Sequence, residues 1–113
     1  RETLVATQVE TVEAESNLDE ALGVEGIDVF FIGPTDLSAS MGHVGEPNHP
    51  DVQAMIENLV NKIRAAGRVA GTTAFTHEAL AKAKEQGFQY IVYSVTAMMA
   101  KSGREYLELA RGP

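Results

Sequence analysis

The chain has 113 residues, of which sixteen are acidic and nine are basic, so its formal net charge is −7. This length fits one small domain, the acidic balance argues against nucleic acid as a partner, and the lack of cysteine excludes disulfides and thiolate metal sites. No apolar run approaches membrane-spanning length, and no signal peptide is recognisable near the N-terminus. We therefore expect a cytoplasmic protein that has no contact with a membrane.

In chain order, the first half predicts two strands, each followed by helical or irregular structure. Residues 4–9 form the first strand, and a short helix then begins at Ser16 or Asn17, with an acid three residues on, and ends at Gly23. Residues 27–32 are apolar at nearly every position, which is typical of a parallel strand buried on both faces. Gly-Pro ends this strand, and short irregular or one-turn structure follows over residues 38–45.

The second half continues the alternation. Apolar residues recur at three- and four-residue spacing after Pro50, which predicts an amphipathic helix that ends near Gly67. Residues 69–75 form the third strand, and Thr76 caps the helix that follows. A fourth strand over residues 90–95 precedes a final helix over about residues 98–110.

Four βα units in succession predict an α/β fold with a parallel sheet and right-handed crossovers. Two architectures compete: a doubly wound open sheet and a (β/α)₈ barrel, of which four units are half. No glycine-rich phosphate-binding fingerprint follows any strand, which weighs against the open nucleotide-binding sheet. We therefore predict one half of a TIM barrel.

Two acids stand at the carboxyl ends of neighbouring strands, where ligands bind in parallel α/β folds. Glu10 closes the first strand and Asp36 follows the second. Neighbouring strands lie about 5 Å apart, so the two carboxylates could share a hard cation such as Mg²⁺ or Mn²⁺. Alternation points Gln8 to the side of Glu10. The residues alone leave a second interpretation open, in which Asp36 caps the next turn and Glu10 is a solvated strand-end acid.

The stretch "QVETVEAESNLDEALGVEGIDVFFIGPTDLSASMGHVGEPNHPDVQAMI" resembles the HpcH/HpaI aldolase/citrate lyase family of metal-dependent pyruvate aldolases. The resemblance covers almost the whole chain and implies that residues 1–113 are a partial domain, the C-terminal half of a (β/α)₈ barrel. It also implies a hexameric assembly. Glu10 and Asp36 would be the two protein ligands of Mg²⁺, Mn²⁺ or Co²⁺, and Gln8 would line the substrate pocket.

The resemblance also implies where the substrate lies. The backbone around Thr35 and Asp36, in a turn shaped by Gly33 and Pro34, would hold the carboxylate of pyruvate, since exposed N–H groups after a strand form an anion-binding concavity. Thr73 would lie where the third strand meets the pocket. Many relatives are apolar there, so a threonine would alter how the aldehyde partner is held.

The activity implied by the resemblance is that of a class II aldolase. A 4-hydroxy-2-oxo acid is cleaved reversibly to pyruvate and an aldehyde through a metal-stabilised pyruvate enolate, without a Schiff-base lysine. The catalytic arginine and histidine of the family come from the first half of the barrel, so we expect the fragment alone to be inactive. His43, His49 and His77 are expected to have surface or capping roles.

Two other functions compete with this one. The first is a CoA-ester lyase of the citrate lyase type, which shares the metal-binding acids but usually needs basic residues for CoA. The second is a non-catalytic half-barrel that serves as a binding or assembly module. Thr96 stands where family members often carry an aspartate, and its role stays open. The final helix, with Leu107 and Leu109, packs either on a neighbouring subunit or on its own barrel.

Overall fold

The computed structural model describes residues 2–113. Its centre is one parallel sheet of four strands, β1 (Ala6–Val9), β2 (Val29–Ile32), β3 (Val69–Thr73) and β4 (Tyr90–Val92). Each strand pairs with the next one along the chain, so the order in the sheet is β1-β2-β3-β4. A doubly wound sheet reverses its strand order at a switch point. The collinear order therefore confirms the barrel type of sheet over the open nucleotide-binding type.

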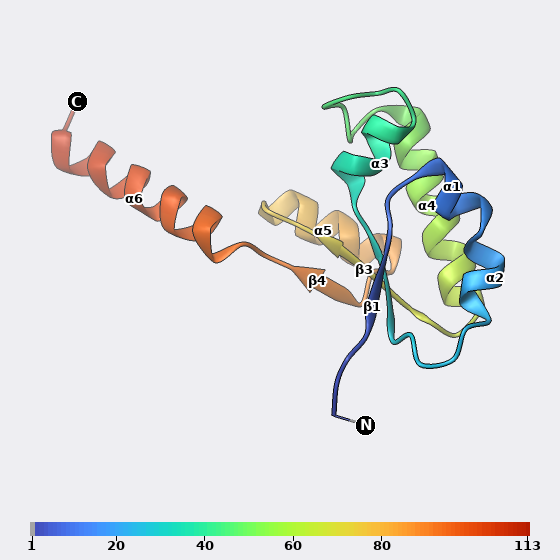
Figure 1. The fold of residues 1–113 in the computed structure, drawn as a ribbon. Coiled ribbons are helices and arrows are strands. Elements are labelled where there is room, and N and C mark those ends of the chain that lie inside the picture. The colour runs from blue at the N-terminus through green and yellow to red at the C-terminus, as the bar shows by residue number, and fades with distance from the viewer. Residues whose placement is uncertain (1) are drawn as a thin grey trace.

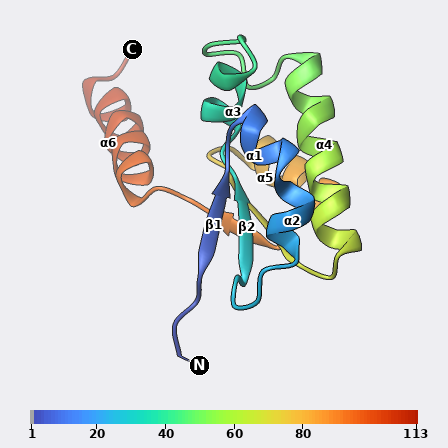
Figure 2. The same cartoon turned by 45° about the vertical axis from the view of Figure 1, so that its right-hand side comes forward.

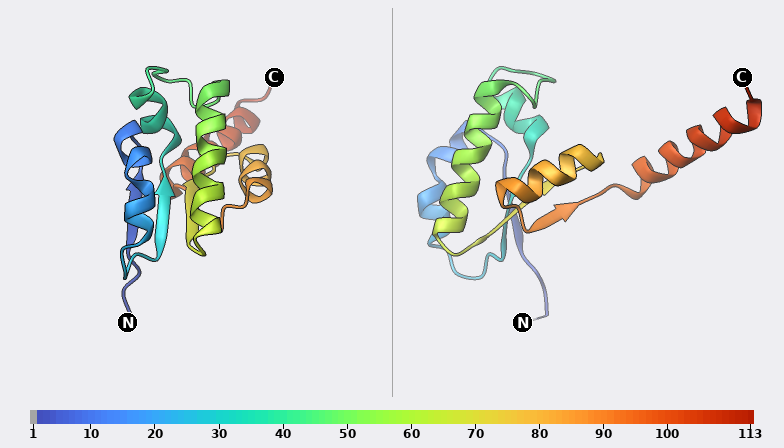
Figure 3. Two further views of the ribbon diagram at one scale, coloured as in Figure 1. Left: turned by 90° about the vertical axis from the view of Figure 1, so that its right-hand side faces the viewer. Right: turned by 180° about the vertical axis from the view of Figure 1, so that it is seen from behind.

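Helices follow every strand, and α1, α2 and α4 lie together on one side of the sheet (Figures 1 and 3). The opposite side of β1 and β2 has no helix over it in the described part of the chain (Figure 2). The six helices are α1 (Val12–Ser16), α2 (Leu18–Leu22), α3 (Pro34–Ser40), α4 (Pro50–Ala65), α5 (His77–Gln86) and α6 (Val95–Arg111).

The hydrophobic core fills the space between the sheet and its helices. Phe30 and Ile32 point from β2 into this core, and both are fully buried. Each fully buried large apolar side chain stabilises the fold by about 1.5–3 kcal/mol. The periodic helix predicted after Pro50 is α4, and its buried residues are Val52, Ile56, Leu59, Val60 and Ile63.

The helix-free face of the sheet carries one row of residues in register. Gln8 pairs with Phe31, Phe31 with Gly71, and Gly71 with Tyr90. The Phe31 and Tyr90 rings meet edge to face with centroids 6.4 Å apart. A Cβ on Gly71 would lie 3.0 Å from Phe31 Cδ2 and 3.1 Å from Tyr90 Cδ1, so only glycine leaves room for both rings. In a closed barrel this face is the interior.

The predicted short helix is α2, whose N-cap residue is Asn17, one of the two predicted caps. The structure adds a helix before it that the sequence did not indicate. Helical structure begins at α1, where the Thr11 hydroxyl accepts a hydrogen bond of 3.0 Å from the Ala14 N–H. Ser16 instead donates to the Val12 carbonyl, and Asn17 separates α1 from α2 without a side-chain cap. Thr11 lies one residue after Glu10, which closes the first strand, and the sequence carries no apolar periodicity that would indicate a helix beginning there. The predicted end at Gly23 is confirmed.

The segment 38–45, predicted to be short irregular or one-turn structure, begins inside the helix α3. The helix α3 begins at Pro34, whose fixed φ suits the first helical position, and the Leu37 N–H donates to the Gly33 carbonyl at 2.9 Å. Ser38 is buried, and its hydroxyl donates to the Thr35 carbonyl at 2.7 Å. This internal hydrogen bond lets a weak helix former sit inside the helix.

The other element ends agree with the sequence to within a few residues. Gly67 has φ +69 just past α4, and Gly87 has φ +95 at the end of α5, as expected of helix-terminating glycines. The Thr76 hydroxyl caps α5 by accepting from the Ala79 N–H, which confirms that prediction. The final helix starts earlier than predicted because Ser94 caps it, so Thr96 lies in its first turn.

The last helix stands apart from the rest of the fold. In Figure 1, α6 extends away from the sheet on the far side of β4. Within the described chain, no residue of α6 is buried, and Leu109 is 82% exposed. None of the helices in residues 2–113 combines the length and the apolar character that crossing a bilayer requires.

Candidate functional site at the carboxyl ends of the strands

The two predicted metal-binding acids lie at the carboxyl ends of β1 and β2. Glu10 directly follows β1, and Asp36 is the third residue of α3, which follows β2 after Gly33 alone. A Cβ built on Gly33 would lie 2.9 Å from Glu10 Oε2 and 3.8 Å from Asp36 Oδ2. Both carboxylate oxygens therefore face one small space beside Gly33.

This space is kept open by the missing side chain of Gly33. The backbone there has φ −96 and ψ 96, an extended conformation that any residue adopts, so conformation does not require glycine. A Cβ would also come within 3.3 Å of Glu10 Cβ. Two carboxylates around a gap form a set of hard oxygen donors, which suits Mg²⁺, Mn²⁺ or Co²⁺. The residues present thus fit the metal that the resemblance implies.

Solvent reaches this end of the sheet. Glu10 is half-buried, whereas Gln8 and Asp36 are exposed. Gln8 lies two residues before Glu10 on the helix-free face of β1, in register with Phe31. The acids are thus accessible to a small molecule, and their neighbour on the same face is an amide that can donate and accept hydrogen bonds.

Asp36 occupies the first turn of α3, and this position bears on the two interpretations left open by the sequence. An acid in the first turn is favoured by the helix dipole. The Thr35 and Asp36 N–H groups belong to the same turn, before the first intrahelical hydrogen bond at Leu37. Asp36 can therefore stabilise the start of α3 through the helix dipole and also bind a metal ion, because both roles need an ionised carboxylate at this position.

A cleft of about 480 Å³ opens beside this site at the carboxyl end of β3. Pro34 and Thr35 line it from α3, and the half-buried Thr73 lines it from the end of β3. Gln8, Glu10 and Asp36 are not among its lining residues. The cleft adjoins the two acids only through the first turn of α3, so the predicted site residues form two neighbouring groups rather than one pocket.

The cleft also contains one titratable group with a shifted pKa. Glu78 lies in the first turn of α5, where hydrogen bonding to its own backbone N–H, and then to the Thr76 hydroxyl, lowers the pKa of its carboxyl below the usual range. Glu78 is fully exposed to solvent. Its carboxylate therefore belongs to the capping of α5, and we give it no role in binding.

Two of the three histidines, His49 and His77, lie in the capping and surface positions expected of them. His49 Nδ1 accepts a hydrogen bond of 3.2 Å from the Asp51 N–H at the start of α4, and the exposed His77 opens α5. The sequence did not show that His43 and His49 come together with Asp51. The sequence signal for a sharply turning loop was the pair of glycines Gly42 and Gly45 around His43. Both have positive φ in the structure.

Comparison with known proteins places this geometry in a family. The HpcH/HpaI aldolase/citrate lyase family model matches residues 1–103. Proteins named 4-hydroxy-2-oxo-heptane-1,7-dioate aldolase, from Salmonella paratyphi B and Salmonella newport, are each 49% identical over 104 residues. The match covers 91% of this chain but only 39% of either relative, so the chain spans well under half of their length.

Solved structures agree with the sequence comparison. An HpcH/HpaI aldolase/citrate lyase family protein from Burkholderia cenocepacia superposes with a TM-score of 0.91 and 29% identity, over 97% of this chain and 43% of that one. An HpcH/HpaI aldolase from Desulfitobacterium hafniense gives 0.82 and 26%, over 97% and 44%. These likenesses confirm four βα units of a TIM barrel. Together with the family model, they show that the chain belongs to the HpcH/HpaI aldolase/citrate lyase family.

Proposed function

We propose that the whole protein is a divalent-metal-dependent class II aldolase that cleaves a 4-hydroxy-2-oxo acid reversibly to pyruvate and an aldehyde. The observation that carries the proposal is the convergence of Glu10 Oε2 and Asp36 Oδ2 on the space beside Gly33. The 49% identity to proteins named for this type of reaction supports the choice of substrate class. The reaction is that of a carbon–carbon lyase.

In this proposal Glu10 and Asp36 hold the cation, which is Mg²⁺, Mn²⁺ or Co²⁺. When bound, the cation supplies positive charge beside the keto and carboxylate oxygens of pyruvate. The two carboxylates orient it from adjacent strands, and Gly33 keeps the space between them free of side-chain atoms. Because Asp36 is exposed and Glu10 only half-buried, positions remain for substrate oxygens and water.

The remaining site residues bind and orient the substrate. Gln8 lies on the same strand face as Glu10 and hydrogen-bonds the substrate from there. The Thr35 and Asp36 N–H groups, in the turn set by Gly33 and Pro34, bind the carboxylate of pyruvate. Thr73 and Thr35 line the adjoining cleft, which we assign to the aldehyde part of the substrate.

Proton transfer needs groups that these four units do not provide. In residues 2–113, no histidine or arginine directly follows a strand at its carboxyl end. We propose that residues 1–113 form a partial domain and that the catalytic arginine and histidine come from the rest of the barrel. The isolated chain should then show no retro-aldol turnover with any divalent metal.

The test uses the full-length protein and two readouts, Mn²⁺ binding and exchange of the methyl protons of pyruvate with solvent. Glu10→Gln and Asp36→Asn should each abolish proton exchange and weaken Mn²⁺ binding at least tenfold, as expected for loss of a charged ligand. Glu13→Gln is the matched control, because Glu13 is an exposed acid in the neighbouring helix α1. Proton exchange that survives either substitution would remove that residue from the metal site.

A further inference from the structure

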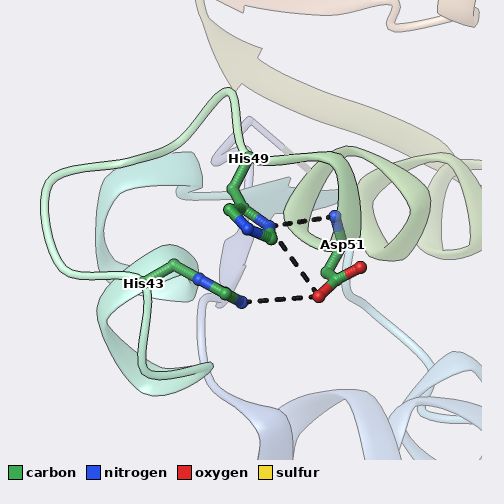
Figure 4. Close-up of side chains that lie close together, drawn as sticks. All are labelled: His43, His49 and Asp51. Carbon is green, nitrogen blue, oxygen red and sulfur yellow. Dashed lines mark hydrogen bonds and ion pairs between the residues drawn. The ribbon is translucent and has the colours of Figure 1, made fainter.

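A second group of potential metal ligands lies in the connection between α3 and α4. Gly42 and Gly45 have φ of +85 and +76, and they turn the chain sharply on either side of His43. Two backbone hydrogen bonds then close the loop, from the Glu46 N–H to the His43 carbonyl at 3.0 Å and from the His49 N–H to the Glu46 carbonyl at 2.9 Å. The fold-back brings His43 and His49 side by side (Figure 4).

Three side chains converge there. The two imidazole rings stack with centroids 3.6 Å apart and planes inclined by 18°. Asp51 Oδ2 lies 3.6 Å from His43 Nε2 and 3.8 Å from His49 Nδ1. One potential ligand atom from each of His43, His49 and Asp51 lies within 4.8 Å of the other two. Figure 4 shows the aspartate on the side toward which both rings present a nitrogen.

Helix capping explains only part of this arrangement. His49 Nδ1 accepts the Asp51 N–H and so caps α4, which accounts for the position of His49 before Pro50. His43 has no part in that cap. Its backbone N–H donates to the Ser38 carbonyl near the end of α3, so its backbone is held by a different helix. The stacking of His43 on His49 places a ring nitrogen of each, both potential metal ligands, beside the carboxylate of Asp51.

We propose that His43, His49 and Asp51 form a binding site for an imidazole-preferring divalent transition metal, of which Zn²⁺ and Ni²⁺ are the representative ions. Two imidazoles with one carboxylate are a frequent ligand set for such ions. Ligand atoms about 2.1 Å from a tetrahedral zinc ion lie roughly 3.4 Å from one another. The observed 3.6 and 3.8 Å to Asp51 Oδ2 are close to that spacing. To bind one ion, the rings must turn out of their stacked arrangement, and His49 Nδ1 must exchange the Asp51 N–H for the ion, because a ring nitrogen has a single lone pair.

This donor set differs in chemistry from the pair of acids beside Gly33. Oxygen-only sites suit Mg²⁺ and Mn²⁺, whereas imidazole nitrogens favour Zn²⁺ and Ni²⁺. The His43 and His49 side chains are 26% and 31% exposed and Asp51 is 71% exposed, so water completes the coordination. The bound ion would fasten the loop after α3 to the first turn of α4.

The proposal is tested by titrating Zn²⁺ into the metal-free full-length protein against a chromophoric chelator. His43→Ala is the key substitution, because it removes a ligand and leaves the cap of α4 intact; it should weaken the Zn²⁺ affinity at least tenfold. His77→Ala is the matched control, since His77 is an exposed histidine outside the cluster, and it should bind as the wild type does. Circular dichroism checks that each variant remains folded.

Two further measurements separate this site from the proposed aldolase site. The double variant Glu10→Gln, Asp36→Asn should keep the Zn²⁺ site that His43→Ala loses, whether or not the aldolase proposal holds. Zn²⁺ should also shift the ring nitrogen NMR signals of His43 and His49. The proposal is overturned if His43→Ala binds Zn²⁺ as tightly as the wild type does, or if only the double variant loses the ion.

Discussion

Replacing Gly33 by alanine tests whether the space between the two acids is essential. The substitution adds one methyl group at a backbone conformation that alanine adopts without strain. The new Cβ would lie 2.9 Å from Glu10 Oε2 and 3.3 Å from Glu10 Cβ. The carboxylate must therefore turn away, and its aliphatic stem must give way by a few tenths of an ångström.

The expected effects on metal binding and on folding have different sizes. Misplacing a group that orients a metal ligand typically weakens affinity about 10–100-fold, which corresponds to about 1.4–2.8 kcal/mol. A compatible Gly→Ala change stabilises a fold by about 0.4–1 kcal/mol through the unfolded state. Crowding against the Glu10 stem opposes that gain, so the free energy of unfolding should change by less than about 1 kcal/mol.

The assay measures Mn²⁺ binding to the full-length Gly33→Ala protein from the paramagnetic resonance of free Mn²⁺, with urea unfolding in parallel. Gly103→Ala in α6 is the control, because among the described residues a Cβ there would meet nothing within 4 Å beyond its chain neighbours and the backbone of its own helix. Wild-type Mn²⁺ affinity in Gly33→Ala would refute the reasoning. So would a loss of binding matched by an equal loss of stability, since that would indicate general damage.

Two other predictions concern the stability of the fold and its assembly. Arg68 donates to the Leu22 carbonyl at 2.9 Å, the Val24 carbonyl at 3.1 Å and the Ile27 carbonyl at 3.3 Å, so Arg68→Met should lower the free energy of unfolding in urea by about 2–3 kcal/mol. Arg68→Lys should restore only part of that loss, and an unchanged urea midpoint for Arg68→Met would show that the hydrogen bonds of Arg68 to these three carbonyls contribute nothing net. Leu107 and Leu109 are 49% and 82% exposed on α6, so changing both to glutamate should reduce the size of the full-length assembly in sedimentation without loss of helical circular dichroism. An unchanged sedimentation coefficient would remove this face of α6 from any subunit contact.

The sequence predicts the architecture well because its signals are local and repeated. The strand β2 is a continuous apolar run, α4 carries apolar periodicity, and both α4 and α5 have recognisable ends. The errors fall where such signals are weak. The helix α3 has no capping side chain and contains two serines, and only its tertiary setting, with Leu37 and Ser38 fully buried, stabilises it.

The candidate site is predictable to a similar degree. Topology brings Glu10 and Asp36 to neighbouring strand ends, so a sequence that shows the strands also shows the pair. The role of Gly33 is not visible in this way, because it depends on the direction of two side chains. The cluster of His43, His49 and Asp51 depends on a loop conformation with two residues at positive φ, and propensity does not specify how such a loop closes.

The collinear sheet also has a consequence for how the chain folds. Every described strand pairs with the strand before or after it in sequence, so each new pairing closes a loop of only one βα unit. Short closures carry small entropic barriers and favour fast folding. We expect the four units to assemble stepwise along the chain, and the slow step to be the final pairing of β1 and β4 with strands outside this sheet, which alone requires distant segments to meet.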